Sequence, residues 1–170
     1  MAEDKAPADA SIENWRRQPV EGRPGFLIRR VQQVHTALFS EETGAERSTP
    51  IMYSVLSALG QSGPLDQTRL GRTVAIDKTN LADVLERLRE RGLVTRRVPT
   101  TDRRVRLSAL TPAGQALLDK LDTRVARAHA RTIAALSPAE QAQFVAFLQR
   151  IVDASEAEAD ARAADMAQSA

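Results

Sequence analysis

The middle of the chain carries a cluster of charged side chains suited to holding an anion. Asp102, Arg103 and Arg104 occupy a short polar turn between residues 94–98 and 105–110, where apolar and polar residues alternate. Alternation is typical of half-buried strands, so the turn is expected at the tip of a β-hairpin. Positive charges crowded at an exposed tip repel one another unless an anion lies nearby. The sequence therefore predicts a hairpin that binds an anion.

A second group of polar side chains is expected at the beginning of a helix. Asp77 is a typical N-cap, which places Lys78, Thr79 and Asn80 in the first helical turn. The helix dipole favours a phosphate there, and short polar side chains can hydrogen-bond to base edges. Asparagine suits adenine, and lysine suits guanine. These three residues, with Arg87 further along the same segment, are the candidate DNA contacts on a helix.

The charge of the chain is unevenly distributed. Residues 69–106 contain eleven Lys and Arg against five Asp and Glu, a net charge of +6, whereas residues 137–170 have a net charge of −4. The overall value of +2 hides this separation. A basic centre beside acidic segments indicates a lobe that binds a polyanion. The alternative is a solvated helix face on which opposite charges pair locally.

Composition excludes several classes of protein. The 170 residues are 42% hydrophobic and include no cysteine, which leaves room for a core and excludes disulfides, thiolate metal sites and thiol redox sensing. The N-terminus has no apolar signal segment, and no apolar run is long enough to cross a membrane. We therefore expect a soluble protein of the cytoplasm that makes no membrane contact.

Catalytic and metal-binding patterns are missing from the sequence. There is no Gly-rich phosphate loop, no Ser-His-Asp order and no pair of catalytic carboxylates. The two histidines, His35 and His129, lie far apart in the sequence, with no cysteine to complete a zinc site. We expect neither an enzyme nor a metal or cofactor site.

The elements that must position these side chains are mainly helices. Apolar residues recur at helical spacing, and cap residues mark the helix starts. Helices are expected over residues 25–43, 50–59, 67–74, 78–91, 112–136 and 138–151. The residues expected to cap all but the first of them are Thr49, Asp66, Asp77, Thr111 and Ser137, the last in a capping box with Glu140.

Three of these helices carry further expectations. In the helix over residues 78–91, Leu81, Val84, Leu85 and Leu88 are expected to form the row that faces inward. In the second, Ile51, Val55 and Leu59 are expected to form the buried row, and Gly60 and Gly63 to end the helix. In the last, the alanine-rich, acidic residues 154–170 either extend the helix or fray. The sequence leaves both possibilities open.

The order of the elements predicts a winged helix-turn-helix. Two short helices are separated by residues 74–77, and a strand and the hairpin follow the second helix. We assign residues 48–110 to this DNA-binding lobe, 25–47 and 111–170 to a helical dimerisation region, and 1–24 to an N-terminal arm. The dimer is expected because the apolar stripes outside the lobe are longer than the lobe can cover. A helical subdomain that closes on itself is the alternative.

The sequence resembles the MarR-type family of bacterial transcriptional regulators. "TDRRVRLSALTPAG" (101–114) is similar to the family's wing signature, although Ala109 makes the strand Leu-Ser-Ala-Leu. "LERLRERGLVTRR" (85–97) and "TPIMYSVLSAL" (49–59) are similar to the end of its recognition helix and to its second helix. The resemblance covers roughly residues 25–152. The residues that match the wing signature are Asp102, Arg104, Leu110, Thr111 and Gly114.

This resemblance implies an intertwined homodimer that represses from a pseudo-palindromic operator until a small effector arrives. In the family the effectors are often aromatic acids, phenols or their thioesters, bound where helices meet the DNA lobe. The candidate ligand contacts by this resemblance are His35, Met52, Tyr53, Arg29 and Trp15. For Tyr53 the alternative is a place in the packed core, and for Trp15 an anchor that holds the arm.

We therefore expect a ligand-responsive repressor that binds double-stranded DNA. The wing residues Arg103 and Arg104 suit the narrow minor groove, and Asp102 is expected to orient Arg104. The alternative is a winged-helix interaction module whose basic face binds an acidic protein. Thr79 and Asn80 favour DNA, because a protein-binding module has no need of base-reading side chains.

Overall fold

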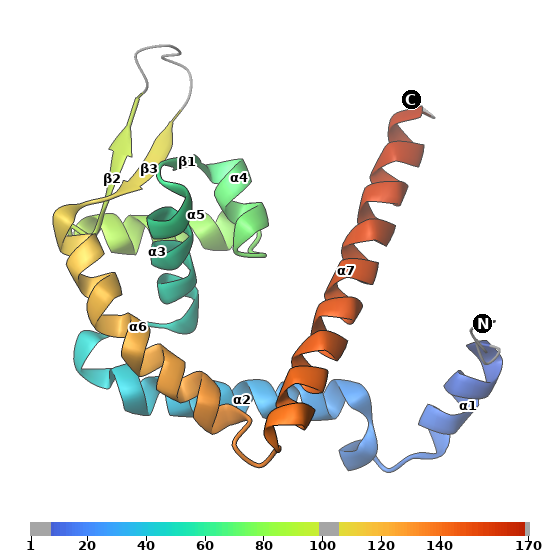
Figure 1. Cartoon of the computed structure of the whole chain (residues 1–170). Helices are drawn as coiled ribbons and strands as arrows, with labels where there is room; N and C mark the ends of the chain where they lie inside the picture. Colours follow the sequence, from blue (N-terminus) through green and yellow to red (C-terminus); the bar gives the residue numbers. More distant parts are fainter. Residues whose placement is uncertain (1–7, 99–105, 169–170) are drawn as a thin grey trace. The chain divides into compact units, whose positions relative to one another are not determined.

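Helices make up most of the chain, which also contains a small antiparallel sheet (Figure 1). The computed structural model describes residues 8–98 and 106–168. The elements are α1 (Ala8–Arg17), η1 (Val20–Gly22), α2 (Pro24–Thr43), η2 (Gly44–Glu46), α3 (Pro50–Ser62), β1 (Leu65–Asp66), α4 (Gln67–Thr73), α5 (Lys78–Glu90), β2 (Val94–Arg97), β3 (Leu107–Leu110), α6 (Pro112–Thr132) and α7 (Pro138–Gln168). The chain divides into two units, one ending at Thr132 and the other starting at Ile133.

The predicted helix caps are confirmed where the sequence placed them. The side chains of Thr49, Asp66 and Asp77 accept backbone N–H groups of the first turns of α3, α4 and α5. At the start of α6, Thr111 Oγ1 accepts the N–H of Gly114 at 3.0 Å. The backbone N–H of Ser137 donates to the Glu140 carboxylate at 2.7 Å, which is one of the two hydrogen bonds of the predicted capping box. Each cap satisfies donors that a helix N-terminus otherwise leaves unpaired.

Several helix ends differ from the prediction. The helix α3 continues through Gly60 to Ser62 and ends at Gly63, the second of the two glycines expected to end it, whose φ is 73°. Gly60 instead permits close packing, since a Cβ there would lie 2.6 Å from the Leu118 side chain of α6. The helix α6 ends at Thr132 rather than at Leu136. The residues that follow form a turn, in which the Leu136 N–H donates to Ile133 O. In the other unit, α7 is continuous to Gln168, which resolves the open alternative in favour of an extended helix.

The hydrophobic core of the first unit lies among α3, α5 and α6. On α5 the predicted inward row of Leu81, Val84, Leu85 and Leu88 is buried. On α3 the predicted row is partly wrong, because Ile51 is 48% exposed. The helix is rotated so that its buried side chains are Met52, Val55, Leu56, Ala58 and Leu59. The interior row of α6 consists of Leu118, Leu121, Val125 and Ala128.

The sheet has three strands in the order β1-β3-β2. The hairpin strands pair antiparallel, with Val94 opposite Leu110 and Arg97 opposite Leu107. The strand β1 pairs with β3 and was not predicted, because two residues are too few to show alternation. The predicted hairpin turn lies outside the described residues. The mainly α fold with a winged helix-turn-helix is confirmed, with α4 and α5 beside the hairpin (Figure 1).

Rows of exposed apolar side chains lie on α2 and on α7, whereas α1 and α3 expose single ones such as Trp15 and Ile51. On α2 the row is Leu27, Ile28, Val31 and Val34, and on α7 it is Val145, Phe147, Leu148, Ile151 and Val152. The apolar stripe of α6 also lies outside the predicted lobe, but it is buried against α2 and α3 within the chain. Within the described ranges, no helix is both long and apolar enough to cross a membrane.

Candidate nucleic-acid interface and effector site

The helices α4 and α5 are held together by a tight turn. Ile76 N–H donates to Gly71 O at 3.0 Å, and a Cβ on Gly71 would lie 3.1 Å from Ile76 O, so glycine permits this approach. A longer-range contact reinforces the turn, because Gln67 Nε2 donates to Lys78 O at 3.1 Å. The start of α5 is therefore fixed by the preceding helix.

The first turn of α5 presents polar side chains to solvent. Lys78, Thr79 and Asn80 are exposed, as the sequence predicted for a DNA-contacting face. Asp77 Oδ1 accepts the backbone N–H groups of Thr79 and Asn80, both at 3.0 Å. These contacts, led by the backbone N–H of Asn80, lower the pKa of Asp77. The cap is thus ionised near neutral pH and holds the turn in place.

Asn80 has a second contact that the sequence did not reveal. Its Nδ2 donates to Asp77 Oδ2 at 2.5 Å, so the cap also fixes the orientation of the side-chain amide. An amide nitrogen has two hydrogens and the amide oxygen is an acceptor, so the geometry leaves a donor and an acceptor for a base edge. Asp77 therefore positions the group best suited to reading adenine.

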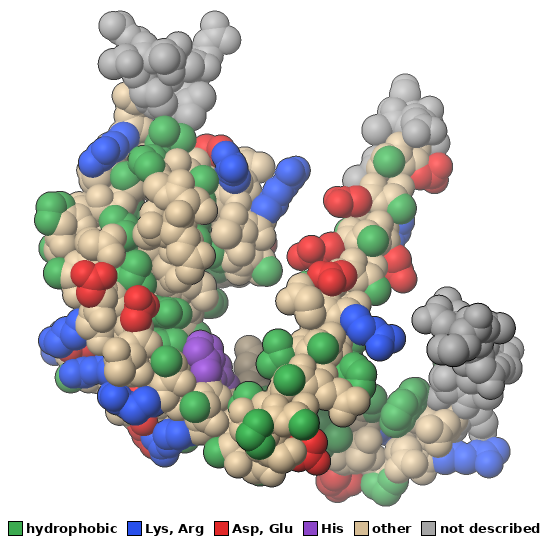
Figure 2. Space-filling view, in the orientation of Figure 1, with side chains coloured by type: hydrophobic (Ala, Val, Ile, Leu, Met, Phe, Trp, Pro, Cys, Tyr) green, Lys and Arg blue, Asp and Glu red, His purple; other side chains and the backbone are tan. Residues whose placement is uncertain are grey.

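Other basic side chains are exposed further along α5 and on the hairpin. Arg87 is exposed on α5, and its Nε donates to Asp83 O at 3.4 Å. Arg96, Arg97 and Arg106 are exposed at the described ends of the hairpin. The sequence pattern marked these three as part of the basic segment but not as individual DNA contacts. Figure 2 shows basic side chains at the end of the lobe that carries the hairpin. Asp102, Arg103 and Arg104 lie outside the described residues.

Four aromatic rings form a row across three helices. His129 of α6 stacks on His35 of α2 with ring centroids 5.0 Å apart. His35 meets the edge of Phe39 at 6.3 Å, and Phe39 lies 6.3 Å from Tyr53 of α3. Sites for small molecules are usually lined by aromatic and apolar side chains together with a few polar groups, as in this row.

His35 and Tyr53, the two residues of the row that were predicted as ligand contacts, both have hydrogen-bond partners on α6. His35 Nδ1 lies 2.9 Å from Thr132 Oγ1, and Tyr53 Oη donates to Asp122 Oδ1 at 3.1 Å. Burial, and then the charge of the neighbouring histidine, lowers the pKa of His35. Burial and the bond to Asp122 raise the pKa of Tyr53. The imidazole and the phenol are therefore neutral at neutral pH. Tyr53 gives its one hydrogen to Asp122, and Thr132 gives its own to Ala128 O at 2.7 Å and so accepts that of His35 Nδ1. His35 Nε2 and Tyr53 Oη are left as acceptors for a ligand hydroxyl.

The other predicted ligand residues are not members of this row. Met52 is 5% exposed and belongs to the core. Arg29 is exposed, with its guanidinium 5.1 Å from the centroid of the Phe26 ring. Trp15 is exposed on α1. His129 was missed, although it lies four residues after the buried Val125 and hence at the edge of the inner face of α6.

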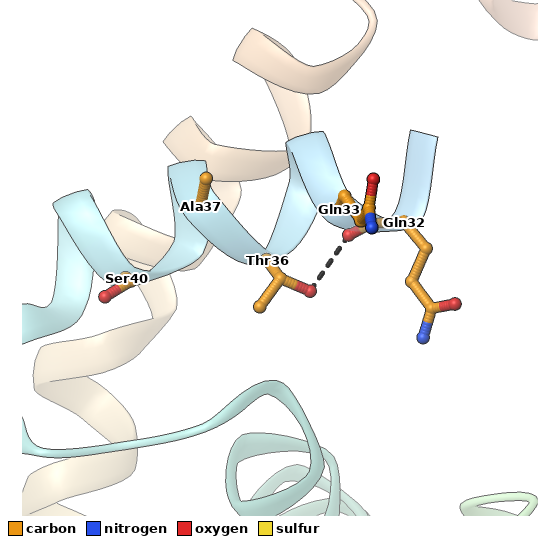
Figure 3. A pocket seen from close by; sticks show the side chains of 5 residues that line it. All are labelled: Gln32, Gln33, Thr36, Ala37 and Ser40. Atoms are coloured by element: carbon orange, nitrogen blue, oxygen red, sulfur yellow. Dashed lines mark hydrogen bonds between the residues drawn. The ribbon is translucent and has the colours of Figure 1, made fainter. Parts of the chain in front are cut away.

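An open depression runs along one face of α2 (Figure 3). Its lining residues are Gln32, Gln33, Thr36, Ala37 and Ser40. Thr36 Oγ1 donates to Gln32 O at 2.9 Å, and Gln33 accepts from Arg30. All lining residues come from one helix and none was a predicted ligand contact. The depression is therefore distinct from the aromatic row.

The chain is similar to known regulators in sequence. Residues 49–105 match the model of the MarR family. The HTH-type transcriptional repressor NicR of Pseudomonas putida is 29% identical over 156 residues, which cover 92% of this chain and 98% of NicR.

Solved structures extend this similarity to the fold. BpsR of Bordetella bronchiseptica, whose DNA binding is regulated by 6-hydroxynicotinic acid, is 30% identical with a TM-score of 0.76, over 80% of this chain and 97% of that one. The transcriptional regulator PcaV of Streptomyces coelicolor, in complex with its natural ligand, is 34% identical with a TM-score of 0.73, over 81% of this chain and 97% of PcaV.

Proposed function

Because this chain belongs to the MarR family of transcriptional regulators, we propose that it is a homodimeric repressor released from a pseudo-palindromic operator by a small aromatic effector. In this proposal it acts on double-stranded DNA in the cytoplasm and catalyses no reaction. Residues 48–110 form the DNA-binding lobe, 25–47 and 111–170 form the dimerisation region, and 1–24 form an arm.

The observation that carries the proposal is the exposed polar first turn of α5. Lys78, Thr79 and Asn80 stand at the positive end of the helix dipole, on an element narrow enough to enter the major groove. Asp77 fixes the Asn80 amide before DNA arrives, which reduces the side-chain entropy lost on binding. Asn80 is therefore assigned to reading a base, and Arg87 to the phosphates.

The wing supplies contacts of a different kind. We assign Arg103 and Arg104 to the minor groove and Asp102 to orienting Arg104. The exposed Arg96 and Arg97 of β2 add positive charge on the same hairpin. Contacts of this type raise affinity for every DNA sequence and weaken as salt rises.

The effector is assigned to the aromatic row. The rings of His35 and Tyr53 offer stacking surface, and His35 Nε2 and Tyr53 Oη can accept a hydrogen bond from a hydroxyl of the ligand. BpsR, a structure to which this chain is similar, responds to an aromatic acid. An aromatic acid, a phenol or a thioester of such an acid is therefore the proposed class. Arg29 and Trp15 are proposed as outer contacts, and Met52, which belongs to the same hydrophobic core as Phe39, as part of the wall behind the rings.

The dimer follows from the exposed apolar rows on α2 and α7. Leu27, Ile28, Val31 and Val34 are all at least 41% exposed, which is unusual for neighbouring apolar positions of a helix in a monomer. A symmetric partner would bury them and would place two copies of α5 about one helical turn of DNA apart.

The proposal is tested with purified protein and DNA selected from a random duplex library, measured by fluorescence anisotropy at one fixed salt concentration. We expect a palindromic selected sequence and weaker binding when 6-hydroxynicotinic acid or another aromatic acid is added. Absence of any sequence preference, together with tight binding to an acidic protein, would instead support the interaction-module alternative.

A further inference from the structure

The C-terminal end of α5 is tied to a loop that is remote in sequence. Arg91, the residue that follows the last turn of α5, donates from Nη1 to Arg47 O at 3.0 Å and from Nη2 to Glu46 O at 2.9 Å. Both acceptors are backbone carbonyls of the segment that connects α2 with α3. This segment, residues 44–47, consists of η2 and its C-cap Arg47 and is called the η2 turn. Hydrogen bonds from a guanidinium are charge-assisted and are roughly twice as strong as neutral ones. One side chain thus bridges two elements at two points.

The η2 turn is fixed in turn to α6. The Glu46 carboxylate pairs with Lys120 Nζ at 2.6 Å and with Arg124 Nη1 at 3.7 Å. These contacts, led by the hydrogen bond from Lys120, lower the pKa of Glu46, so the pairs persist to acidic pH. Arg47 itself adopts the left-handed conformation with φ of 48°, which few residues other than glycine occupy. The carbonyls that Arg91 contacts are therefore held in place by their surroundings.

The opposite end of α5 is held by a different element. Gln67 of α4 donates to Lys78 O, and both helices belong to the same lobe. Arg91 differs because it joins α5 to the end of α2, the helix that also carries His35 of the aromatic row. Arg91 can therefore set the angle of α5 relative to α2 and α6, which the contact from Gln67 within the lobe cannot do.

We propose that Arg91 is a positioning residue that fixes the angle of α5 on the α2–α6 platform and so sets the half-site spacing that the dimer accepts. The inference rests on the proposed function, because spacing has meaning only for a DNA-binding dimer. Arg91 acts through the η2 carbonyls and needs no contact with DNA. Its removal loosens the angle of α5 but leaves the base-reading first turn and its Asp77 cap unchanged.

The test compares spacing preference in the wild type and Arg91→Gln. Duplexes carry two copies of the half-site selected by the wild type, with their separation varied one base pair at a time. We expect the wild type to prefer one spacing by about tenfold or more, and Arg91→Gln to reduce that preference several-fold while keeping its preference for the half-site sequence. Arg91→Lys keeps the charge but has a single donor nitrogen, so an intermediate profile is expected.

Arg89→Gln is the matched control, because it removes the same charge two residues before Arg91. The Arg89 side chain pairs locally on α5, with Glu86. If Arg91→Gln keeps the wild-type spacing profile, or changes it no more than Arg89→Gln does, the positioning role is overturned. A uniform loss of affinity at all spacings would also overturn it, since that is the effect of removing charge alone.

Hydrogen exchange of the free protein separates this inference from the proposed function. The amides of Arg91, Gly92 and Leu93 are bonded to carbonyls of α5, and that of Arg47 to Gly44 O. We expect Arg91→Gln, but not Arg89→Gln, to accelerate exchange in both segments. If neither segment changes, the bridge has no positioning role, whatever the DNA result. A wild type that binds no DNA contradicts the proposed function, whereas the exchange comparison still decides the role of Arg91.

Discussion

The imidazole rings of His35 and His129 stack in parallel, with centroids 5.0 Å apart and an interplanar angle of 5°. Their helices, α2 and α6, pack along each other, and Thr132 holds the His35 ring through Nδ1. Two imidazoles at this distance repel each other when both are protonated. The pair therefore makes this helix contact sensitive to pH in the range where histidine titrates.

The stability of the protein should fall as the pH drops below about 6.5. Burial and His129 lower the pKa of His35 in the folded state, so the unfolded chain takes up the proton first. The stabilisation from neutral His35 is complete above the ordinary pKa and is lost as the pH falls toward the lowered one. Urea unfolding at about pH 7.5 and about pH 5.5 should show this loss in the wild type and a smaller loss in His35→Phe. Equal losses in both proteins would contradict the assignment.

Removal of the Asp77 cap should reduce both stability and sequence reading. Asp77→Ala removes the acceptor of two backbone N–H groups and of the Asn80 amide, so we expect a loss of about 1 kcal/mol in the free energy of unfolding. The ratio of specific to non-specific DNA affinity should fall as well. Asp66→Ala is the control, since it removes an N-cap of α4 without touching Asn80. It should destabilise the protein by a similar amount and change the ratio less.

Asn80→Ala should act on sequence reading alone. We expect a loss of about 1–3 kcal/mol at the selected operator, the usual contribution of a good base contact, with non-specific binding nearly unchanged. The melting temperature should change little, because Asn80 is exposed and the backbone cap remains. An unchanged affinity ratio together with a lower melting temperature would mean that Asn80 only supports the cap, and that Lys78 or Thr79 reads the base.

The wing arginines should act on all DNA sequences alike. Arg103→Ala or Arg104→Ala is expected to weaken specific and non-specific binding and to lower the slope of log affinity against log salt by about one for each phosphate that is no longer neutralised. The slope is measured by titration at several salt concentrations. A slope identical to that of the wild type would remove these residues from the interface.

Gly114 should tolerate no side chain. A Cβ at this position would lie 2.0 Å from Leu93 O, a backbone atom that cannot move aside, so Gly114→Ala should cost about 1–3 kcal/mol or more in unfolding free energy. Gly44→Ala is the matched control, because no atom lies within 4 Å of its Cβ position and its φ is −51°. It should leave stability unchanged or raise it by about 0.4–1 kcal/mol. The unfolding free energies of both variants are measured by denaturant unfolding. A loss in Gly114→Ala alone would show that the steric clash, and not the exchange of glycine for alanine, destabilises the protein.

The sequence by itself determined the features that depend on neighbours along the chain. The caps Thr49, Asp66 and Asp77, the inward row that begins at Leu81, and the order of the helices from α2 to α7 and of the two hairpin strands were predicted correctly. Each is set by hydrogen bonds or spacings within a few residues, so local pattern is enough. The family was predicted from short segments of the same kind, and residues 49–105 match its model.

Tertiary structure decided the features that depend on how helices pack. The rotation of α3 that buries Met52 and exposes Ile51, the role of Gly60 against Leu118, and the stacking of His129 on His35 all involve distant helices. The bridge from Arg91 to the η2 turn joins residues that are 44 positions apart. A single sequence gives the face that a helix can bury but not the partner that buries it, because that choice is made by the three-dimensional fit of side chains from several elements at once.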